Sequence, residues 1–291
     1  MWTSKATTSR RDVLRLGGGT LALLAGCLDQ RKQANGKDPT TSSNTSDTSD
    51  SSPTSTTTSE PVDVSVSNVT VVPGIVAPNT PDSVAVFGDR DEQFLILNVA
   101  PSGQPSPASA DFTLSTDAGT TAPKDIRDIA SHGNPFDRTN PYEGAGTGYL
   151  LYSLSNPLET DSVSLRWPGG EYEFENDVVS ALTRPPTDFR VGGLDVPESV
   201  ESGTELTLSV TIENTGSVEG TFVGALNRSG PYVAHTPVKA ISIDLAPGES
   251  ETWTHTYTPT LDDPEHAGGM QYYFDWRDGS KSVELSVEPP S

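Results

Sequence analysis

The most restrictive feature of the sequence is an alternation of apolar and polar residues that begins at residue 62. Val62, Val64 and Val66 alternate with polar residues, and the same pattern runs through 206–212. Turn residues interrupt the alternation about every 8–12 positions. A period of two is that of a strand, because successive side chains point to opposite faces of a sheet. The sequence therefore predicts an all-β fold built from stacked sheets.

A first β-sandwich domain is predicted over residues 61–184. Phe94–Val99 is a continuous apolar run, which suits a central strand. Pro168-Gly169-Gly170 is expected to form a hairpin turn between strands at 162–167 and 171–174.

A second β-sandwich domain is predicted over residues 187–288. Pro185-Pro186 interrupts the strand pattern before it and marks a short, stiff boundary, because proline favours an extended backbone. Asn214 and Gly216 are expected to supply the positive backbone angles of a tight turn. About seven strands are expected in this domain, as in the immunoglobulin-like fold. The predicted architecture is two immunoglobulin-like β-sandwiches in tandem. In the second, strands are expected at 206–212, 220–227, 238–245, 251–257, 270–276 and 282–287.

Residues 1–27 have the layout of an export signal peptide, with a basic start, a short apolar stretch and a small-residue end. Arg10 and Arg11 lie in a segment that resembles the twin-arginine signal, which implies export of an already folded chain. Leu24-Ala25-Gly26-Cys27 resembles the lipobox of prokaryotic lipoproteins, and Cys27 is the one cysteine of the sequence. This resemblance implies that Cys27 becomes the lipidated N-terminus of the mature protein.

Residues 28–60 contain almost no apolar side chains and are rich in Ser, Thr and Asp. Such a composition cannot bury a core, so a disordered, mucin-like stalk is expected. Asn44, Asn68 and Asn227 begin Asn-X-Ser/Thr tripeptides, which are acceptor sites for N-glycosylation. Tripeptides of this kind also arise by chance in chains rich in Ser and Thr.

The charge of the chain is strongly acidic. The sequence has 40 Asp plus Glu against 18 Lys plus Arg, a formal net charge of -22. Such a surface repels phosphate backbones, so nucleic acid is not expected as a partner. The carboxylates extend into strand patterns such as 171–175, which favours a folded surface adapted to molar salt. An acidic docking face for one cationic partner is the alternative. Combined with the export signal, this composition resembles that of haloarchaeal lipoproteins.

The last third of the chain resembles the CARDB domain, the cell-adhesion-related domain of bacterial and archaeal surface proteins. The likeness lies in Leu206–Gly216, in Phe222 and in the segment Ile243–Ser250. It implies a seven-stranded sandwich used as a surface module, and it implies no catalytic residue. The first domain more loosely resembles the telokin-like immunoglobulin domains of prokaryotic lipoproteins, through Gly148–Tyr152 and Leu165–Trp167.

Residues 117–147 are long for a connection within a sandwich, and loops of this length are often functional. Residues 123–130 form the one segment of the chain that is expected to be helical. Phe136 and Tyr142 follow it among prolines and are candidates for contact with a partner. Packing of both rings against their own domain is the alternative.

The sequence contains no recognisable catalytic motif, which favours a non-enzymatic protein. None of the four histidines has a second histidine or a cysteine at metal-ligand spacing, and no nucleophile or nucleotide-binding motif follows the signal. His255 shares a strand face with aromatic residues and is expected to be a packing residue. The acidic turns 88–92 and 262–266 lack the full ligand series of a calcium loop, so solvated turns are expected, with a calcium site as the alternative. No catalytic residue, metal or cofactor is predicted.

These observations favour a non-enzymatic, lipid-anchored protein on the extracellular face of the cell membrane. It would present two β-sandwich domains for adhesion, envelope organisation or protein docking. Its partners would be the membrane, through the lipid on Cys27, and an unidentified surface protein or glycan. The alternative is a solute-capture or transporter-accessory lipoprotein, which needs a concave pocket between the domains. A hydrolase of envelope polymers would need a cleft with two close carboxylates or a metal.

Overall fold

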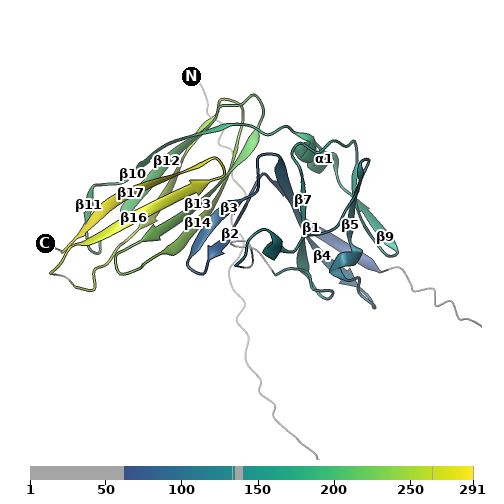
Figure 1. The fold of residues 1–291 in the computed structure, drawn as a ribbon, viewed down its shortest axis with the longest axis horizontal. Coiled ribbons are helices and arrows are strands. Elements are labelled where there is room, and N and C mark those ends of the chain that lie inside the picture. The colour runs from purple at the N-terminus through teal and green to yellow at the C-terminus, as the bar shows by residue number, and fades with distance from the viewer. Residues whose placement is uncertain (1–61, 133, 135–139, 264, 291) are drawn as a thin grey trace, which may run out of the picture. The chain divides into compact units, whose positions relative to one another are not determined.

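A computed structural model of the chain describes residues 62–132, 134, 140–263 and 265–290. The predictions for Arg10, Arg11, Cys27, Asn44 and the stalk fall outside the described residues, as does Phe136. The described part is an all-β structure with a single short α-helix, which confirms the predicted fold class (Figure 1).

The first sandwich consists of two facing antiparallel sheets. One sheet has the order β1-β4-β7 and the other the order β6-β5-β8-β9. Side chains from both sheets form the core between them, with Leu95 and Leu97 from one sheet and Leu114 and Leu165 from the other. The strands are β1 (Asp63–Val72), β4 (Glu92–Ser102), β5 (Thr113–Thr116), β6 (Gly119–Thr121), β7 (Gly148–Ser155), β8 (Val163–Trp167) and β9 (Gly170–Glu173).

The central strand β4 is buried on both faces. Leu95, Leu97 and Val99 point into the core between the two sheets. Phe94 and Ile96 point to the opposite face, where they join a second apolar cluster. This two-sided burial accounts for the continuous apolar run of the sequence. A strand that is buried on one face only would instead show alternating apolar and polar residues.

A hairpin of β2 (Ile75–Thr80) and β3 (Ser83–Phe87) covers that second face. Ile75 and Ala77 pack against Phe94 and Ile96, together with Ile126 from the long loop. The hairpin therefore forms an additional layer on the outside of the β1-β4-β7 sheet.

The α-helix lies where the sequence did not indicate one. Helix α1 spans Asn176–Thr183, and its Leu182 is fully buried against the first core. The expected helix at 123–130 is wrong, because this segment contains a single 3-10 turn at Ile126–Asp128. The backbone N–H of Arg127, the second residue of this turn, donates to the side chain of the N-cap residue Asp125 at 2.9 Å.

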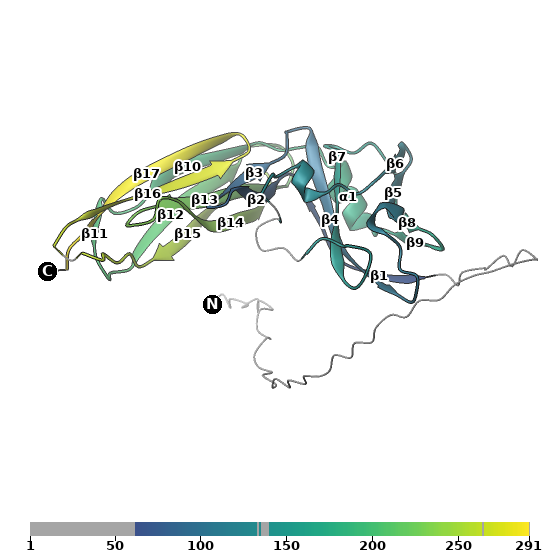
Figure 2. The ribbon, with the colours of Figure 1, turned by 60° about the horizontal axis from the view of Figure 1, so that its bottom comes forward.

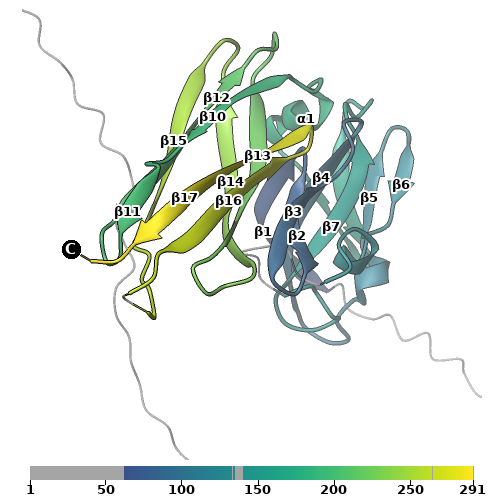
Figure 3. The same ribbon diagram turned by 60° about the vertical axis from the view of Figure 1, so that its left-hand side comes forward.

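The second sandwich also has two facing sheets, with the orders β10-β12-β15 and β11-β17-β16-β13-β14 (Figure 3). Leu206, Leu208, Val210 and Ile212 are buried and alternate with exposed or half-buried residues, as the period of two predicted. The strands are β10 (Phe189–Asp195), β11 (Ser199–Glu201), β12 (Leu206–Asn214), β13 (Gly220–Ser229), β14 (Thr236–Leu245), β15 (Ser250–Tyr257), β16 (Gly268–Trp276) and β17 (Gly279–Glu288).

The turn after β12 has a different basis from the predicted one. Neither Asn214 nor Gly216 has a positive φ. Asn214 is fully buried, and its side chain donates to Leu245 O at 2.9 Å and accepts from Thr187 Oγ1 at 2.8 Å. A Cβ at Gly216 would lie 2.0 Å from that same Thr187 oxygen. The asparagine therefore ties the turn through its side chain, and the glycine is required for space.

Candidate functional site: the junction between the sandwiches

The junction between the sandwiches is an apolar contact made by the β2–β3 hairpin. Because side chains alternate along a strand, the face of the hairpin opposite Ala77 presents Val76 and Val84. These two residues pack against Ala225 of β13, and all three are buried. Figures 1 and 2 show β2 and β3 beside β13 and β14. The hairpin is therefore shared between the two sandwiches.

Asn227 fixes this contact with two hydrogen bonds. Val84 N donates to Asn227 Oδ1 at 2.9 Å, and Asn227 Nδ2 donates to Val84 O at 2.8 Å. The Asn227 side chain is 2 % exposed. Its neighbour Asp275 is also partly buried, and burial raises the pKa of that carboxyl group, while the nearby Asn227 side chain acts in the opposite direction.

Asn227, a predicted glycan acceptor, is buried in this geometry. The amide nitrogen that would carry the glycan is buried and donates to Val84. A folded chain has no room for a sugar at that atom. Asn68, in contrast, is exposed, at an irregularity of β1 with φ 51°, and it stays a predicted acceptor.

Two ion pairs border the junction on its surface. Arg90 Nη2 lies 2.5 Å from Asp188 Oδ1, and Arg184 Nη1 lies 3.7 Å from Glu219 Oε1. Their side chains are largely exposed, and exposed pairs contribute little to stability and less in high salt. The buried contacts of Val84 and Asn227 therefore determine the strength of the junction.

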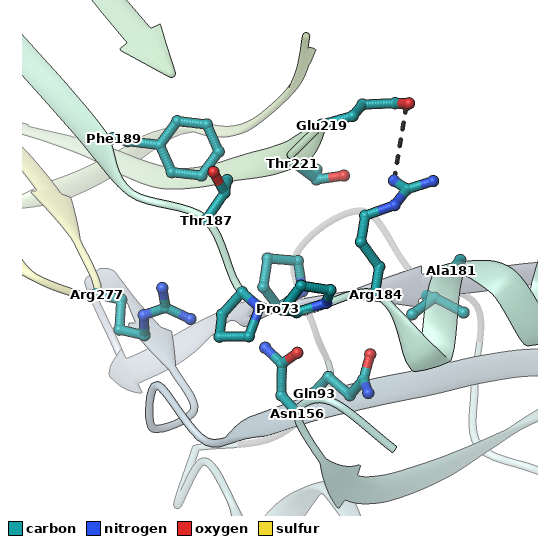
Figure 4. A pocket seen from close by; sticks show the side chains of 14 residues that line it. Pro73, Gln93, Asn156, Ala181, Arg184, Thr187, Phe189, Glu219, Thr221 and Arg277 are labelled. Carbon is teal, nitrogen blue, oxygen red and sulfur yellow. Dashed lines mark ion pairs between the residues drawn. The ribbon is translucent and has the colours of Figure 1, made fainter. Parts of the chain in front are cut away.

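A small cavity of about 80 Å³ lies beside the ion pair of Arg184 and Glu219, which both line it (Figure 4). Gln93 lines it and is held by two bonds, from Nε2 to Ser155 O and to Leu182 O, both at 2.7 Å. Arg277 lines the other side, and its buried Nε makes no hydrogen bond within the described residues. Ligand pockets usually measure about 300–1,000 Å³. A volume of about 80 Å³ has room for a few waters and is too small for a larger solute.

A wider recess of about 510 Å³ lies on the first sandwich, along the segments 122–127 and 141–143. Lys124, Arg127 and Glu143 give its lining mixed charge. Its lining also includes Asn134 and Pro141, which flank residues outside the described part.

Tyr142, a candidate for contact with a partner, is buried within the first sandwich. Its side chain is 3 % exposed, its hydroxyl donates to Pro107 O at 2.7 Å, and its ring meets Phe112 edge-on at 5.5 Å between centroids. Burial, and to a lesser extent the Asp111 carboxylate, raises the pKa of the Tyr142 hydroxyl. These contacts favour the alternative interpretation, in which the ring packs against its own domain.

His255 lies in an aromatic cluster on the inner face of β15. Its ring is parallel to that of Trp253 at 6.2 Å and meets the edge of Tyr272 at 6.4 Å. Burial lowers the pKa of the imidazole, and the nearby Arg228 and Lys239 lower it further. A neutral ring in this position packs as an aromatic side chain, as the sequence predicted.

Acidic side chains of the two turns make contacts with other protein groups. His266 Nδ1 lies 2.8 Å from Asp263 Oδ2, and Glu92 accepts a short hydrogen bond from Ser153 and lies 3.9 Å from Lys124 Nζ. Among the residues that the structure describes, no group of three or more His, Cys, Asp or Glu side chains could hold a metal ion.

None of the helices in the described part is long and apolar enough to cross a membrane.

Two features of this region were not found from the sequence. The apolar residues of 75–77 and 84–87 fall on both faces of their strands, and this was the available signal that the hairpin is covered on two sides.

Tyr232, in the loop between β13 and β14, is 58 % exposed and has a φ of 59°, which is uncommon for a bulky residue. Its hydroxyl accepts from Asp263 N at 3.3 Å.

No family model matches the chain, and no curated protein matches it. Among solved structures, it is similar to a β-glucosidase from Listeria innocua, with 16% identity over 35% of this chain and 16% of that one, at a TM-score of 0.30. A β-glucosidase from Erythrobacter marinus matches at 18% identity over 35% of this chain and 15% of that one, also at 0.30. The CARDB domain of a Pyrococcus furiosus protein, in complex with di-metal ions, matches at 18% identity over 35% of this chain and 92% of that domain, at 0.26.

The chain thus spans 16% of the length of the Listeria innocua enzyme that it matches. A CARDB domain is a weak structural neighbour of the chain. At these identities and TM-scores the comparisons carry no argument about activity.

Proposed function

We propose that the chain is a non-enzymatic, lipid-anchored surface protein whose two joined sandwiches dock to another component of the cell envelope. The support comes from the junction. Two-domain proteins that capture solutes or act on polymers commonly bind them in a cleft between the domains. Here the β2–β3 hairpin fills that space with Val76, Val84 and the Asn227 bonds. The cavity of about 80 Å³ that remains at the junction is too small for a metabolite.

The same contacts favour a surface module over a hinged receptor. A hinged protein keeps its interdomain contacts few and polar, so that they can open and close. In this chain the contact is apolar, buried and tied by a side chain that pairs with a backbone group 143 residues away. The two sandwiches then move as one body. A protein of this kind offers its outer faces to a partner.

Anchoring is tested by fractionating cells that express the wild-type chain or Cys27→Ser. We expect the wild type in the membrane fraction, with a lipidated N-terminal Cys27, and the variant in the soluble exported fraction. Recovery of an uncleaved, unmodified wild-type chain from the cytosol would contradict the anchor. The variant is a suitable control because Cys27 is the only cysteine of the chain, so no disulfide is lost.

Docking is tested by cross-linking intact cells and by a thermal shift screen of the purified full chain. We expect the wild type to form discrete cross-linked complexes with an envelope component, and Cys27→Ser to lose them. A panel of sugars, amino acids and divalent cations should leave the melting temperature unchanged. Stabilisation by one of these small solutes would favour the solute-capture alternative and overturn the proposal.

A further inference from the structure

Strand β15 is an open edge of the second sandwich. It pairs with β12 without interruption from Leu206 opposite Tyr257 to Glu213 opposite Ser250. In the sheet order β10-β12-β15 it is an outer strand. Among the described residues, no backbone hydrogen bond joins 250–257 to a strand on its other side. Half of its backbone N–H and C=O groups therefore point away from the sheet.

The other outer strands of this sandwich are protected against edge-to-edge pairing. Strand β10 has an irregularity between Val191 and Leu194. Strand β11 has three residues, and β14 contains Pro237 and Lys239. Bulges, short length, proline and lysine are the devices by which proteins block a sheet edge. Strand β15 has none of them: it is regular over eight residues and contains no proline or lysine.

The side chains of β15 alternate between two kinds. Thr252, Thr254 and Thr256 are exposed on the outer face of the sheet. Trp253, His255 and Tyr257 are half-buried on the inner face. None of these six residues is an acid or a lysine, although the chain has a net charge of -22. Glu251, near the start of β15, is the one acid of the strand. A second copy of the chain can therefore pair along 252–257 without bringing two strand carboxylates together.

We propose that β15 pairs antiparallel with β15 of a second copy of this chain. A two-fold pair places one residue opposite its own counterpart, so residues of the same parity face each other. With Thr254 at the centre, Thr252 faces Thr256 and Trp253 faces His255 of the second copy. Threonine pairs and aromatic pairs are both favourable across strands. The alternation of β15 is therefore self-complementary in two-fold registers centred on residues 252–257, where Glu251 does not face its own counterpart.

The pairing joins the two β10-β12-β15 sheets into one continuous sheet across the dimer. The threonine rows also continue, because Thr207, Ser209 and Thr211 of β12 lie opposite Thr256, Thr254 and Thr252 within one copy. This self-association goes beyond the proposed docking function and does not depend on the lipid. Failure of one leaves the other intact, since the anchor is tested on Cys27 and the dimer on β15.

The experiment is a cysteine scan in the full chain carrying Cys27→Ser, which has no other cysteine. Single cysteines replace each residue from Thr252 to Tyr257 in turn. Directly opposite residues of an antiparallel pair have Cα atoms about 4.5–5.5 Å apart, within the range of a disulfide. We expect mild oxidation to yield a disulfide-linked dimer at the position on the two-fold axis. Thr207→Cys is the matched control, because this exposed threonine lies on β12, one strand away from the edge.

The reduced, cysteine-free chain should also sediment as a dimer in molar salt. Thr254→Pro and His255→Pro then test the edge. Since N–H groups alternate sides along a strand, one of the two variants removes an outward N–H and keeps the β12 pairing. The variant that retains the native circular dichroism spectrum should dimerise at least tenfold more weakly. A monomeric cysteine-free chain overturns the proposal, as does cross-linking at Thr207→Cys equal to that on β15.

Discussion

The side-chain amide of Asn227 pairs with the backbone of Val84 as a peptide group of a neighbouring strand would. The two bonds measure 2.9 and 2.8 Å, and both partners are nearly inaccessible to solvent. Residue 84 belongs to the hairpin of the first sandwich, whereas residue 227 belongs to β13 of the second. The pairing thus satisfies the polar groups of an otherwise apolar contact and fixes which residues of the two sandwiches meet.

Loss of this amide should destabilise the chain strongly. Asn227→Ala leaves the buried N–H and C=O of Val84 without partners, so we expect the free energy of unfolding to fall by about 2–4 kcal/mol. Guanidinium chloride unfolding followed by tryptophan fluorescence measures the change. Asn140→Ala, at an exposed asparagine, is the control and should change stability by less than about 0.5 kcal/mol.

The near-isosteric Asn227→Asp separates hydrogen bonding from packing. At neutral pH a carboxylate oxygen would face Val84 O, with the Asp275 carboxyl group nearby. We expect this variant to be as unstable as Asn227→Ala at pH 7 and to recover part of its stability on acidification, when the new carboxyl group can donate. Wild-type stability of Asn227→Asp at pH 7 would contradict the role assigned to the amide.

The strands of both sandwiches were predictable because their burial repeats with the local period of the sequence. Leu206, Leu208, Val210 and Ile212 are buried as the alternation required, and Gly169 has the positive φ of the predicted hairpin turn. Helix α1 was missed since it has eight residues and contains the β-branched Val178 and Val179, which are weak helix formers. A pattern this short does not separate a helix from a strand end.

The junction could not be predicted from local patterns. The Asn-Arg-Ser tripeptide at 227 has the same local form whether it is exposed or buried, and its burial depends on Val84, which is 143 residues away. Tyr142 likewise reads as an aromatic loop residue until Pro107 and Phe112 are placed around it. Each of these outcomes follows from a contact between distant segments, which period and composition do not encode.

Glycan mapping should distinguish the two sequons of the described part. Asn68 is exposed and can be occupied, whereas Asn227 is enclosed by its bonds to Val84. In the exported protein we expect glycopeptides, where present, to contain Asn68 and never Asn227, as measured by mass spectrometry of the proteolysed chain. A glycan on Asn227 would mean that the junction forms after glycosylation or not at all.

Two buried tyrosines should respond to removal of their hydroxyl groups with opposite sign. Tyr152 is fully buried, its hydroxyl has no hydrogen-bond partner among the described residues, and burial raises its pKa. Tyr152→Phe should therefore stabilise the chain by about 1 kcal/mol. Tyr142→Phe removes the bond to Pro107 O and should destabilise it by about 1 kcal/mol. Chemical unfolding of the wild type and both variants measures the two changes in the free energy of unfolding. A loss of stability in Tyr152→Phe would contradict the prediction, because it would mean that the Tyr152 hydroxyl has a hydrogen-bond partner.

Acid sensitivity of the second sandwich should depend in part on His255. Burial, Arg228 and Lys239 hold the pKa of its imidazole below 6.5 in the folded chain. As the pH falls through 6.5, the unfolded chain takes up the proton first, so the free energy of unfolding decreases. Above that pH the ring is neutral in both states and contributes no pH dependence. We therefore expect the melting temperature of His255→Gln to fall less than that of the wild type between pH 7.5 and pH 5. His132→Gln, at an exposed histidine that bonds Ser131, should keep the wild-type profile, and an equal fall in all three proteins would contradict the role of His255.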